Sequence, residues 1–269
     1  MTEDLRAKDS HFAFGDNWRA YSRLIDEEKI AKAVAGMSRL LPEGEVRGRR
    51  LLDIGCGSGL HSLSALRLGA AHVHALDIDP ASAATARDVL ETWGPKGASW
   101  AVETLSVFDP AFAALGTYDI VYSWGVLHHT GDMWAAIEAA AGRVADRGLL
   151  CLALYRTTSL DAFWVAEKRW YAKASPRSQA VARGIFHGAF TLASLFKGRS
   201  GTADERGMDY WHDMHDWLGG YPYESVLPPE LDRRLTGLGF KAETVLARGK
   251  EFGLFGSGCD EFVYRRRGA

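Results

Sequence analysis

The sequence predicts an α/β protein with a largely parallel sheet. Two observations carry this prediction. Short apolar segments alternate with amphipathic helical segments from residue 50 to residue 155, and the alternation resumes after residue 226. Strands that alternate with helices pair in parallel through right-handed crossovers. In addition, a glycine-rich turn follows the first predicted strand. Glycine has no Cβ and tolerates positive φ, so this turn lets the backbone approach a nucleotide-like ligand closely.

The pattern places each element in turn. Predicted strands cover residues 51–54, 73–78, 100–102, 118–123, 149–155, 241–247 and 259–265. Predicted helices cover residues 81–93, 133–144 and 228–238, and a further helical pattern precedes the break at Pro42 and Gly44. The resulting division is an N-terminal arm and helix over residues 1–46, a core over 47–155 and 226–269, and a mainly helical cap over 156–225.

Composition limits the class of protein. The 269 residues are 47% hydrophobic and 25% charged, as in ordinary globular proteins, and the formal net charge of −2 provides no global field for nucleic acid or a membrane. The three cysteines are far apart, which favours reduced thiols over a disulfide framework or a zinc site. There is no clustered metal-ligand set, no apolar run of about 18 residues and no signal core, so we predict a cytoplasmic protein without a metal or a transmembrane segment.

The spacing of the glycine turn separates two kinds of nucleotide site. The run Asp53-x-Gly55-x-Gly57-x-Gly59 differs from the G-x-G-x-x-G of dinucleotide-binding folds and is preceded by an acid. It resembles motif I of the class I S-adenosylmethionine (SAM)-dependent methyltransferases. The resemblance implies a Rossmann-like sheet of seven strands, the last one antiparallel, with helices on both faces. It also implies SAM as cofactor, S-adenosylhomocysteine (SAH) as product, and cofactor contacts from Asp53, Gly55, Cys56, Gly57 and Gly59.

Further cofactor contacts are expected at the ends of the second and third strands. Asp77 is placed to accept hydrogen bonds from both ribose hydroxyls, whereas Asp79 is expected to cap the next helix. By the same resemblance, Ile78 packs on one face of the adenine. The adenine edge is expected to meet the segment that contains Ser106, Val107 and Asp109, in which either Ser106 or Asp109 supplies the polar partner.

The run of residues 122–131, YSWGVLHHTG, lies just after the fourth strand. It resembles the corresponding segment of many small-molecule methyltransferases, in which the methyl donor and the acceptor meet. This implies cofactor contacts from Ser123 and Trp124. His128 or His129 is a candidate general base, because imidazole titrates near neutral pH, and the alternative is that both histidines position the backbone. An Asn-Pro-Pro-Tyr-type motif is absent, which argues against DNA adenine and protein glutamine as acceptors.

The acceptor is expected to lie under the arm and the cap. Residues 156–199 hold eight Lys/Arg and two Asp/Glu, whereas residues 204–224 hold one and six. Candidate acceptor contacts are Phe14, Trp18, Tyr21, Tyr155, Arg206, Met208, Tyr221, Tyr223 and Glu224. The alternatives are an ordered loop held by its own aromatic residues and an arm that only staples itself to the core.

Together these patterns predict a SAM-dependent methyltransferase that moves a methyl group to an oxygen or nitrogen of a small molecule, such as a sugar, a natural product or a related metabolite. The expected mechanism is in-line displacement, with catalysis mainly from proximity and alignment. The alternatives are an RNA or protein methyltransferase and a SAM-binding protein without turnover. DNA is not expected as a partner.

Overall fold

The computed structural model describes residues 4–7, 11–197, 210–247 and 252–268. The elements in chain order are α1 (Phe14–Ser22), α2 (Glu27–Leu40), α3 (Glu43–Val46), β1 (Arg50–Ile54), α4 (Leu60–Arg67), β2 (His72–Asp77), α5 (Pro80–Trp93), β3 (Trp100–Thr104), α6 (Pro110–Ala114), β4 (Tyr118–Trp124), the 3-10 turn η2 (Leu127–His129), α7 (Met133–Ala141), β5 (Val144–Tyr155), α8 (Asp161–Lys173), α9 (Pro176–Lys197), α10 (Tyr210–Gly219), α11 (Pro228–Gly237), β6 (Phe240–Leu246) and β7 (Cys259–Arg266).

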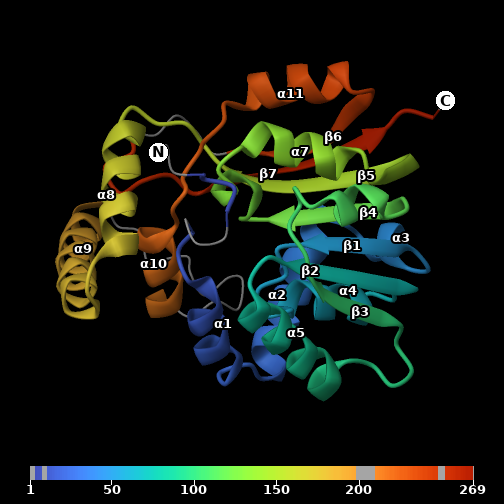
Figure 1. The fold of residues 1–269 in the computed structure, drawn as a ribbon, viewed down its shortest axis with the longest axis horizontal. Coiled ribbons are helices and arrows are strands. Elements are labelled where there is room, and N and C mark those ends of the chain that lie inside the picture. The colour runs from blue at the N-terminus through green and yellow to red at the C-terminus, as the bar shows by residue number, and fades with distance from the viewer. Residues whose placement is uncertain (1–3, 8–10, 198–209, 248–251, 269) are drawn as a thin grey trace.

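The strands form one seven-stranded sheet in the order β3-β2-β1-β4-β5-β7-β6. The pairs among β1 to β5 are parallel, while β7 is antiparallel to both of its neighbours. Six strands therefore run in one direction and the last runs against them, which confirms the predicted sheet (Figure 1). The strand order reverses between β1 and β4, the position at which open α/β sheets bind their ligands.

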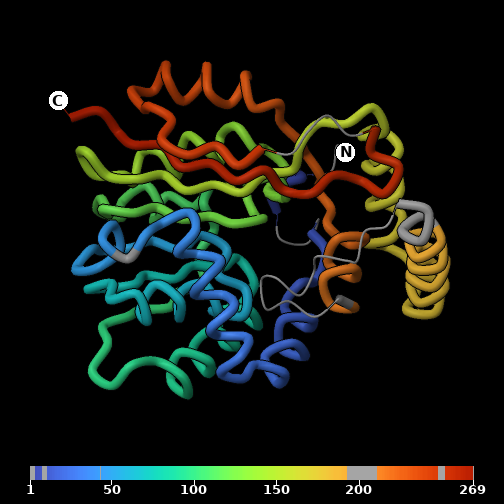
Figure 2. The backbone as a smooth tube through the Cα atoms, turned by 180° about the vertical axis from the view of Figure 1, so that it is seen from behind, coloured from blue at the N-terminus to red at the C-terminus, as the bar shows by residue number. Residues whose placement is uncertain are grey.

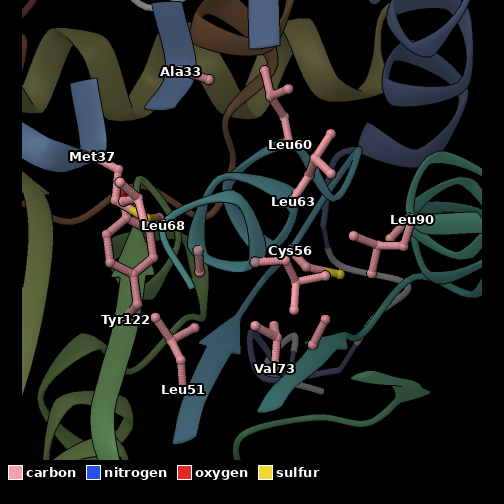
Figure 3. Close-up of a cluster of buried hydrophobic side chains, with 14 of the residues drawn as sticks. Ala33, Met37, Leu51, Cys56, Leu60, Leu63, Leu68, Val73, Leu90 and Tyr122 are labelled. Carbon is pink, nitrogen blue, oxygen red and sulfur yellow. The ribbon is translucent and has the colours of Figure 1, made fainter. Parts of the chain in front are cut away.

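Helices cover both faces of the sheet, and successive strand residues point to opposite faces. Leu51 belongs to a core shared with α2, α4 and α5, whereas Leu52 belongs to a core shared with α7 and α11. Figure 3 shows part of the first core, where Met37, Leu63 and Val73 converge from a helix, a second helix and a strand. Helices on both faces are thus confirmed.

One boundary differs from the sequence-based prediction. The helix predicted over 133–144 ends at Ala141, and β5 begins at Val144 rather than at residue 149. The register against β4 shifts between Tyr118 and Ile120, so residues 145–148 bulge out of the ladder. Arg147 has φ 60° within this bulge. The sequence predicts a turn here that precedes the strand, whereas the strand already begins before the bulge, at Val144.

After β5 the chain leaves the sheet and forms α8, α9 and α10 before it returns through α11 (Figure 1). Figure 2 shows α9 at the outer edge of this group from the opposite side. The group has its own core of aromatic and aliphatic side chains, which includes Tyr155 at the end of β5 and Phe12 from the arm. Among the described residues, we find no helix that is both long and apolar enough to cross a bilayer.

Candidate active site

The glycine turn lies between β1 and α4, beside the point where the strand order reverses. Gly55, Gly57 and Gly59 have φ values of 76°, 54° and 80°, a region that side chains other than glycine rarely adopt. A Cβ on Gly59 would lie 2.9 Å from the Cα of Ala86 in α5. The glycines therefore fix a left-handed turn and permit α4 to pack closely on α5.

Asp77 joins this turn to the end of β2. Its Oδ2 accepts a hydrogen bond from the Gly57 N–H at 3.0 Å, and its Oδ1 accepts one from the Asp79 N–H at 2.8 Å. Asp79 in turn caps α5, because its Oδ1 accepts from the Ala81 N–H at 2.9 Å. The predicted division of roles is confirmed for Asp79 as the helix cap, while the ribose contact of Asp77 stays a prediction.

Asp53 is buried beneath the turn, where the Ser62 hydroxyl donates to its Oδ2 at 2.6 Å. Burial raises the pKa of Asp53 to about 7; the Ser62 hydrogen bond opposes this shift, and the nearby charge of Asp77 adds to it. Cys56 contributes its backbone N–H to the Leu76 carbonyl, while its thiol lies in the core (Figure 3). The side chain of Cys56 therefore points away from the site.

The arm covers the glycine turn. A Cβ on Gly57 would lie 2.9 Å from the Trp18 ring, and a Cβ on Gly15 would lie 2.7 Å from the Asp79 Oδ2. Helix α1 therefore packs directly on the loops after β1 and β2. Tyr21 is placed differently from the acceptor contact that we predicted: it is fully buried in the core shared with α2 and α4.

The predicted adenine segment is held by its own turn. The Asp109 carboxylate caps α6 by accepting from the Ala111 N–H at 2.7 Å, and the Ser106 hydroxyl accepts from the Phe108 N–H at 3.2 Å. Both candidates thus have local roles, and the choice between them stays open. Ile78 and Val107 are half-buried near the ends of their strands.

Two predicted cofactor contacts at the end of β4, Ser123 and Trp124, direct their side chains elsewhere. The fully buried Ser123 donates its hydroxyl to the Ile54 carbonyl at 3.0 Å, which ties β4 to β1. The Trp124 indole donates to Glu261 Oε1 at 2.8 Å and lines a small cavity with Met37 and His61. The cofactor contacts of Ser123 and Trp124 stay predictions.

His128 and His129 lie side by side in η2, with ring centroids 4.3 Å apart. His128 is fully buried, and the centroid of its ring lies 4.1 Å from the centroid of the Tyr155 ring. Neither of its ring nitrogens has a hydrogen-bond partner among the described residues. The Nδ1 of His129 lies 2.7 Å from the Pro222 carbonyl oxygen and must carry the proton, because a carbonyl can only accept. Burial lowers the pKa of His128 well below its usual range and that of His129 to about 3, so both rings are neutral at neutral pH.

Residues 219–226 form the wall opposite the histidines. The Glu224 N–H donates to the His128 carbonyl at 2.9 Å, and the Glu224 carboxylate accepts from the Met133 N–H at 2.8 Å. Glu224, predicted as an acceptor contact, therefore satisfies the first turn of α7. The ring centroids of Tyr223 and Tyr155 lie 5.3 Å apart, so these two residues lie together, and their contact with an acceptor stays a prediction.

The remaining predicted acceptor residues fall into three groups. Phe14 lies 5.7 Å from the His129 ring and so reaches the same wall from the arm. Tyr221 is buried, and its carbonyl accepts from the Phe12 N–H at 3.0 Å, which fastens the arm to the cap. Arg206 and Met208 lie outside the residues that the structure describes.

Lys168 is the residue that sequence reasoning missed. It is fully buried on α8, its Nζ donates to the Trp217 carbonyl, and the Nζ lies 5.3 Å from the centroid of the Tyr223 ring. Burial lowers the pKa of Lys168 to about 7, and the neighbouring Glu167 charge opposes that shift. Its spacing from Trp164 and Tyr171, four and three positions away, marks it as part of the buried face of a helix.

Three comparisons place these features among known proteins. Residues 52–150 match a family model described as a methyltransferase domain. The chain is 34% identical over 117 residues to the ribosomal protein L11 methyltransferase of Stenotrophomonas maltophilia, a match that covers 42% of this chain and 36% of that protein. It is 36% identical over 135 residues to the ubiquinone biosynthesis O-methyltransferase of Xanthomonas euvesicatoria, covering 49% of this chain and 54% of that one.

The chain thus spans between about a third and about a half of the length of these two curated relatives. Among solved structures, it is similar to magnesium protoporphyrin IX methyltransferase from Synechocystis with bound SAH. That match has 18% identity and a TM-score of 0.52, and it covers 88% of this chain and 81% of the other. At this identity the likeness shows a shared fold.

Proposed function

Residues 52–150 belong to the class I SAM-dependent methyltransferase family, and on that premise we propose that the chain transfers a methyl group from SAM to an oxygen or nitrogen of a small-molecule acceptor. The observation that carries the acceptor side of this proposal is that neither ring nitrogen of the fully buried His128 has a hydrogen-bond partner among the residues that the structure describes. A buried polar group without a partner is costly, so its retention calls for an explanation. A hydroxyl or amine of the acceptor supplies the missing hydrogen bond.

The glycine turn fits the cofactor. The left-handed glycines carry no side chains of their own, Val126 and Trp18 pack against Gly55 and Gly57, and the Asp77 carboxylate stands at the end of the next strand. Gly55 and Gly57 would frame the methionine end of SAM, and Asp77 would hold its ribose. When bound, SAM supplies an electrophilic methyl group on its sulfonium.

The chain's own residues would align the acceptor for in-line attack and exclude water. Tyr155, Tyr223 and Phe14 supply apolar walls around the two histidines. The neutral His128 ring can accept a hydrogen bond from the acceptor and so orient its lone pair toward the methyl group. The low pKa values of both rings favour this positioning role over a general base, since a base is most effective with a pKa near the working pH.

The enclosure of this site supports a small acceptor. His128 is fully buried, and the arm and the loop of residues 219–226 pack against each other above η2. A macromolecular acceptor would require a side chain or base to enter this enclosed space. Reaction with RNA or protein is therefore the alternative that the experiment must exclude.

The test is incubation of the purified protein with SAM labelled in its methyl group and an extract of the source cells, split by size into small molecules, protein and RNA. We expect the label in the small-molecule fraction, together with release of SAH. The His128→Phe variant, which keeps a ring of similar size, is expected to bind SAM in calorimetry with unchanged affinity and to transfer little label. Label in the protein or RNA fraction would refute the small-molecule assignment.

A further inference from the structure

Lys168 is a buried cation whose hydrogen-bonding capacity is not filled by the described part of the chain. Its side chain is fully buried on α8, and its Nζ donates one hydrogen bond, to the Trp217 carbonyl. A lysine ammonium has three N–H donors, so two of them have no acceptor among the residues that the structure describes. Among the same residues, no carboxylate lies within ion-pair distance of the Nζ.

The surroundings of the Nζ are aromatic. The Nζ lies 3.8 Å from the centroid of the Trp217 ring, 5.3 Å from that of Tyr223 and 6.0 Å from that of Tyr155. These rings, together with the Trp217 carbonyl in the last turn of α10, offset part of the cost of taking an ammonium out of water. A lysine that served only the end of α10 could keep its ammonium in water, as lysines usually do. The buried position of Lys168 therefore indicates an anionic partner that arrives with a ligand.

Lys168 and His128 lie beside the same tyrosine ring. The centroid of the His128 ring lies 4.1 Å from the centroid of the Tyr155 ring, and the Lys168 Nζ lies 6.0 Å from that centroid. Burial is the main cause of the low pKa values of His128 and His129, and the Lys168 charge lowers both further, as expected for a cation close to these rings. The unfilled donors of Lys168 and the unpartnered nitrogens of His128 therefore belong to one part of the acceptor wall.

We propose that the methyl acceptor is a small carboxylic acid whose carboxylate binds the Lys168 ammonium, while its hydroxyl or amine meets His128. This inference rests on the proposed function and names the class of its substrate. The carboxylate is the anchor and is not itself methylated. Hydrogen bonds between an ammonium and a carboxylate are among the strongest in proteins, and the surrounding rings exclude the water that would weaken them. Two fixed contacts on one small molecule would hold its nucleophile in line with the methyl group.

The charge of the site favours a carboxylate over a phosphate. Two other cations of residues 156–192 are half-buried, and both have partners: Arg156 pairs with Asp260 at 2.8 Å, and Arg183 donates to the Tyr171 hydroxyl at 2.8 Å. The remaining cations of this stretch are exposed. Lys168 therefore supplies a single positive charge, which balances a carboxylate but would leave one charge of a phosphate dianion uncompensated in a buried site.

Titration of the full chain with benzoate and with benzamide, in the presence of excess SAH, tests this inference without turnover. The two probes have the same ring and nearly the same size, but only benzoate carries a charge. We expect benzoate to bind about tenfold more tightly than benzamide in ligand-observed NMR, because it alone forms the charge-assisted hydrogen bond. K168M is expected to weaken benzoate binding about tenfold and to leave benzamide binding unchanged. K168R keeps the charge and should bind benzoate more tightly than K168M does.

The matched control is K173M, which removes a lysine from the exposed end of the same helix and should bind both probes like the wild type. Circular dichroism on each variant establishes that it is folded. Equal affinity of the wild type for the two probes would overturn the inference, and so would benzoate binding that K168M leaves unchanged. Either result leaves the proposed methyl transfer standing. Conversely, benzoate binding that depends on Lys168 in a protein that transfers no label would refute the proposed function and retain the carboxylate site.

Discussion

The two ends of the candidate site are built in opposite ways. At the glycine turn, the carboxylates satisfy hydrogen-bond donors of the chain: Asp77 accepts from two backbone N–H groups and Asp79 caps α5. At the acceptor wall, buried polar groups lack partners among the described residues. His128 has no such partner for either of its ring nitrogens.

This difference indicates where stability and function lie. The glycine turn is held in place by local backbone contacts and has its geometry before any ligand binds. The acceptor wall retains costly polar groups, as expected where a protein gives up stability for a ligand contact. Substitutions at the first end should therefore abolish cofactor binding, whereas substitutions at the second should leave cofactor binding intact and change turnover or stability.

The largest effect is expected from G57R. Gly57 has φ 54°, and any Cβ there would lie within 2.9 Å of the Trp18 ring, so an arginine both strains the turn and fills the cradle. We expect SAM binding to fall below detection in titration calorimetry. The matched control is G97R, because Gly97 also has a positive φ of 74° but has open space around it. Unchanged SAM affinity in G57R would refute the motif I assignment.

A smaller loss is expected from D77A. If Asp77 holds the ribose, removal of its carboxylate costs one or two hydrogen bonds, which is on the order of 1–3 kcal/mol of SAM binding free energy. The measurement is again the Kd for SAM in calorimetry.

Asp79 provides the comparison for this variant. D79A removes the cap of α5, which should cost about 1 kcal/mol of unfolding free energy while the SAM Kd stays constant. The opposite pattern, with affinity lost only in D79A, would transfer the ribose contact to Asp79.

The same difference explains what could be predicted from the sequence. The glycine turn, the cap at Asp79 and the reversed last strand follow from short-range patterns or from the family that those patterns resemble. The start of β5 could not be predicted, because the bulge at residues 145–148 has the composition of a turn and only pairing with β4 extends the strand past it.

The acceptor wall could be predicted only in outline. His129 meets Pro222 across 93 positions of sequence, and no local pattern specifies that pairing. The burial of Lys168 could not be predicted, because it depends on Trp217 and Tyr223 from another segment. The direction of Trp124 is decided by Glu261 on a strand more than a hundred residues away.

The acceptor wall should make the protein sensitive to acid. His129 has a pKa of about 3 in the folded chain and about 6.5 when unfolded, so between these values the unfolded state binds more protons. Its contribution to stability therefore falls as pH drops below 6.5, by up to about 1.4 kcal/mol per pH unit. Urea unfolding from pH 7 to 5 measures this contribution as the difference in unfolding free energy between the wild type and H129Q. The glutamine retains a hydrogen-bond donor for the Pro222 carbonyl.

Asp53 has the opposite effect: its pKa is raised in the folded state, so its protonation at lower pH favours folding. Both proteins contain Asp53, so this effect cancels in the difference between their unfolding free energies. A difference that does not change with pH would mean that His129 titrates normally and is not buried as a neutral ring.

The smallest effect, and the one that separates function from stability most directly, is expected from K168M. Methionine keeps the unbranched length of lysine but removes a buried charge that has no carboxylate within ion-pair distance among the described residues. We expect Tm to rise by a few degrees, about 1 kcal/mol, because the cost of burying the ammonium disappears. SAM affinity should not change, whereas transfer of the labelled methyl group should fall, because Lys168 faces the aromatic wall and not the glycine turn.

The control is K173M, at the exposed end of the same helix, for which Tm and methyl transfer should both match the wild type. A lower Tm in K168M would mean that Lys168 stabilises the packing of the cap. The contrast between the hydrogen-bonded carboxylates of the glycine turn and the unpartnered polar groups of the acceptor wall would then rest on His128 alone.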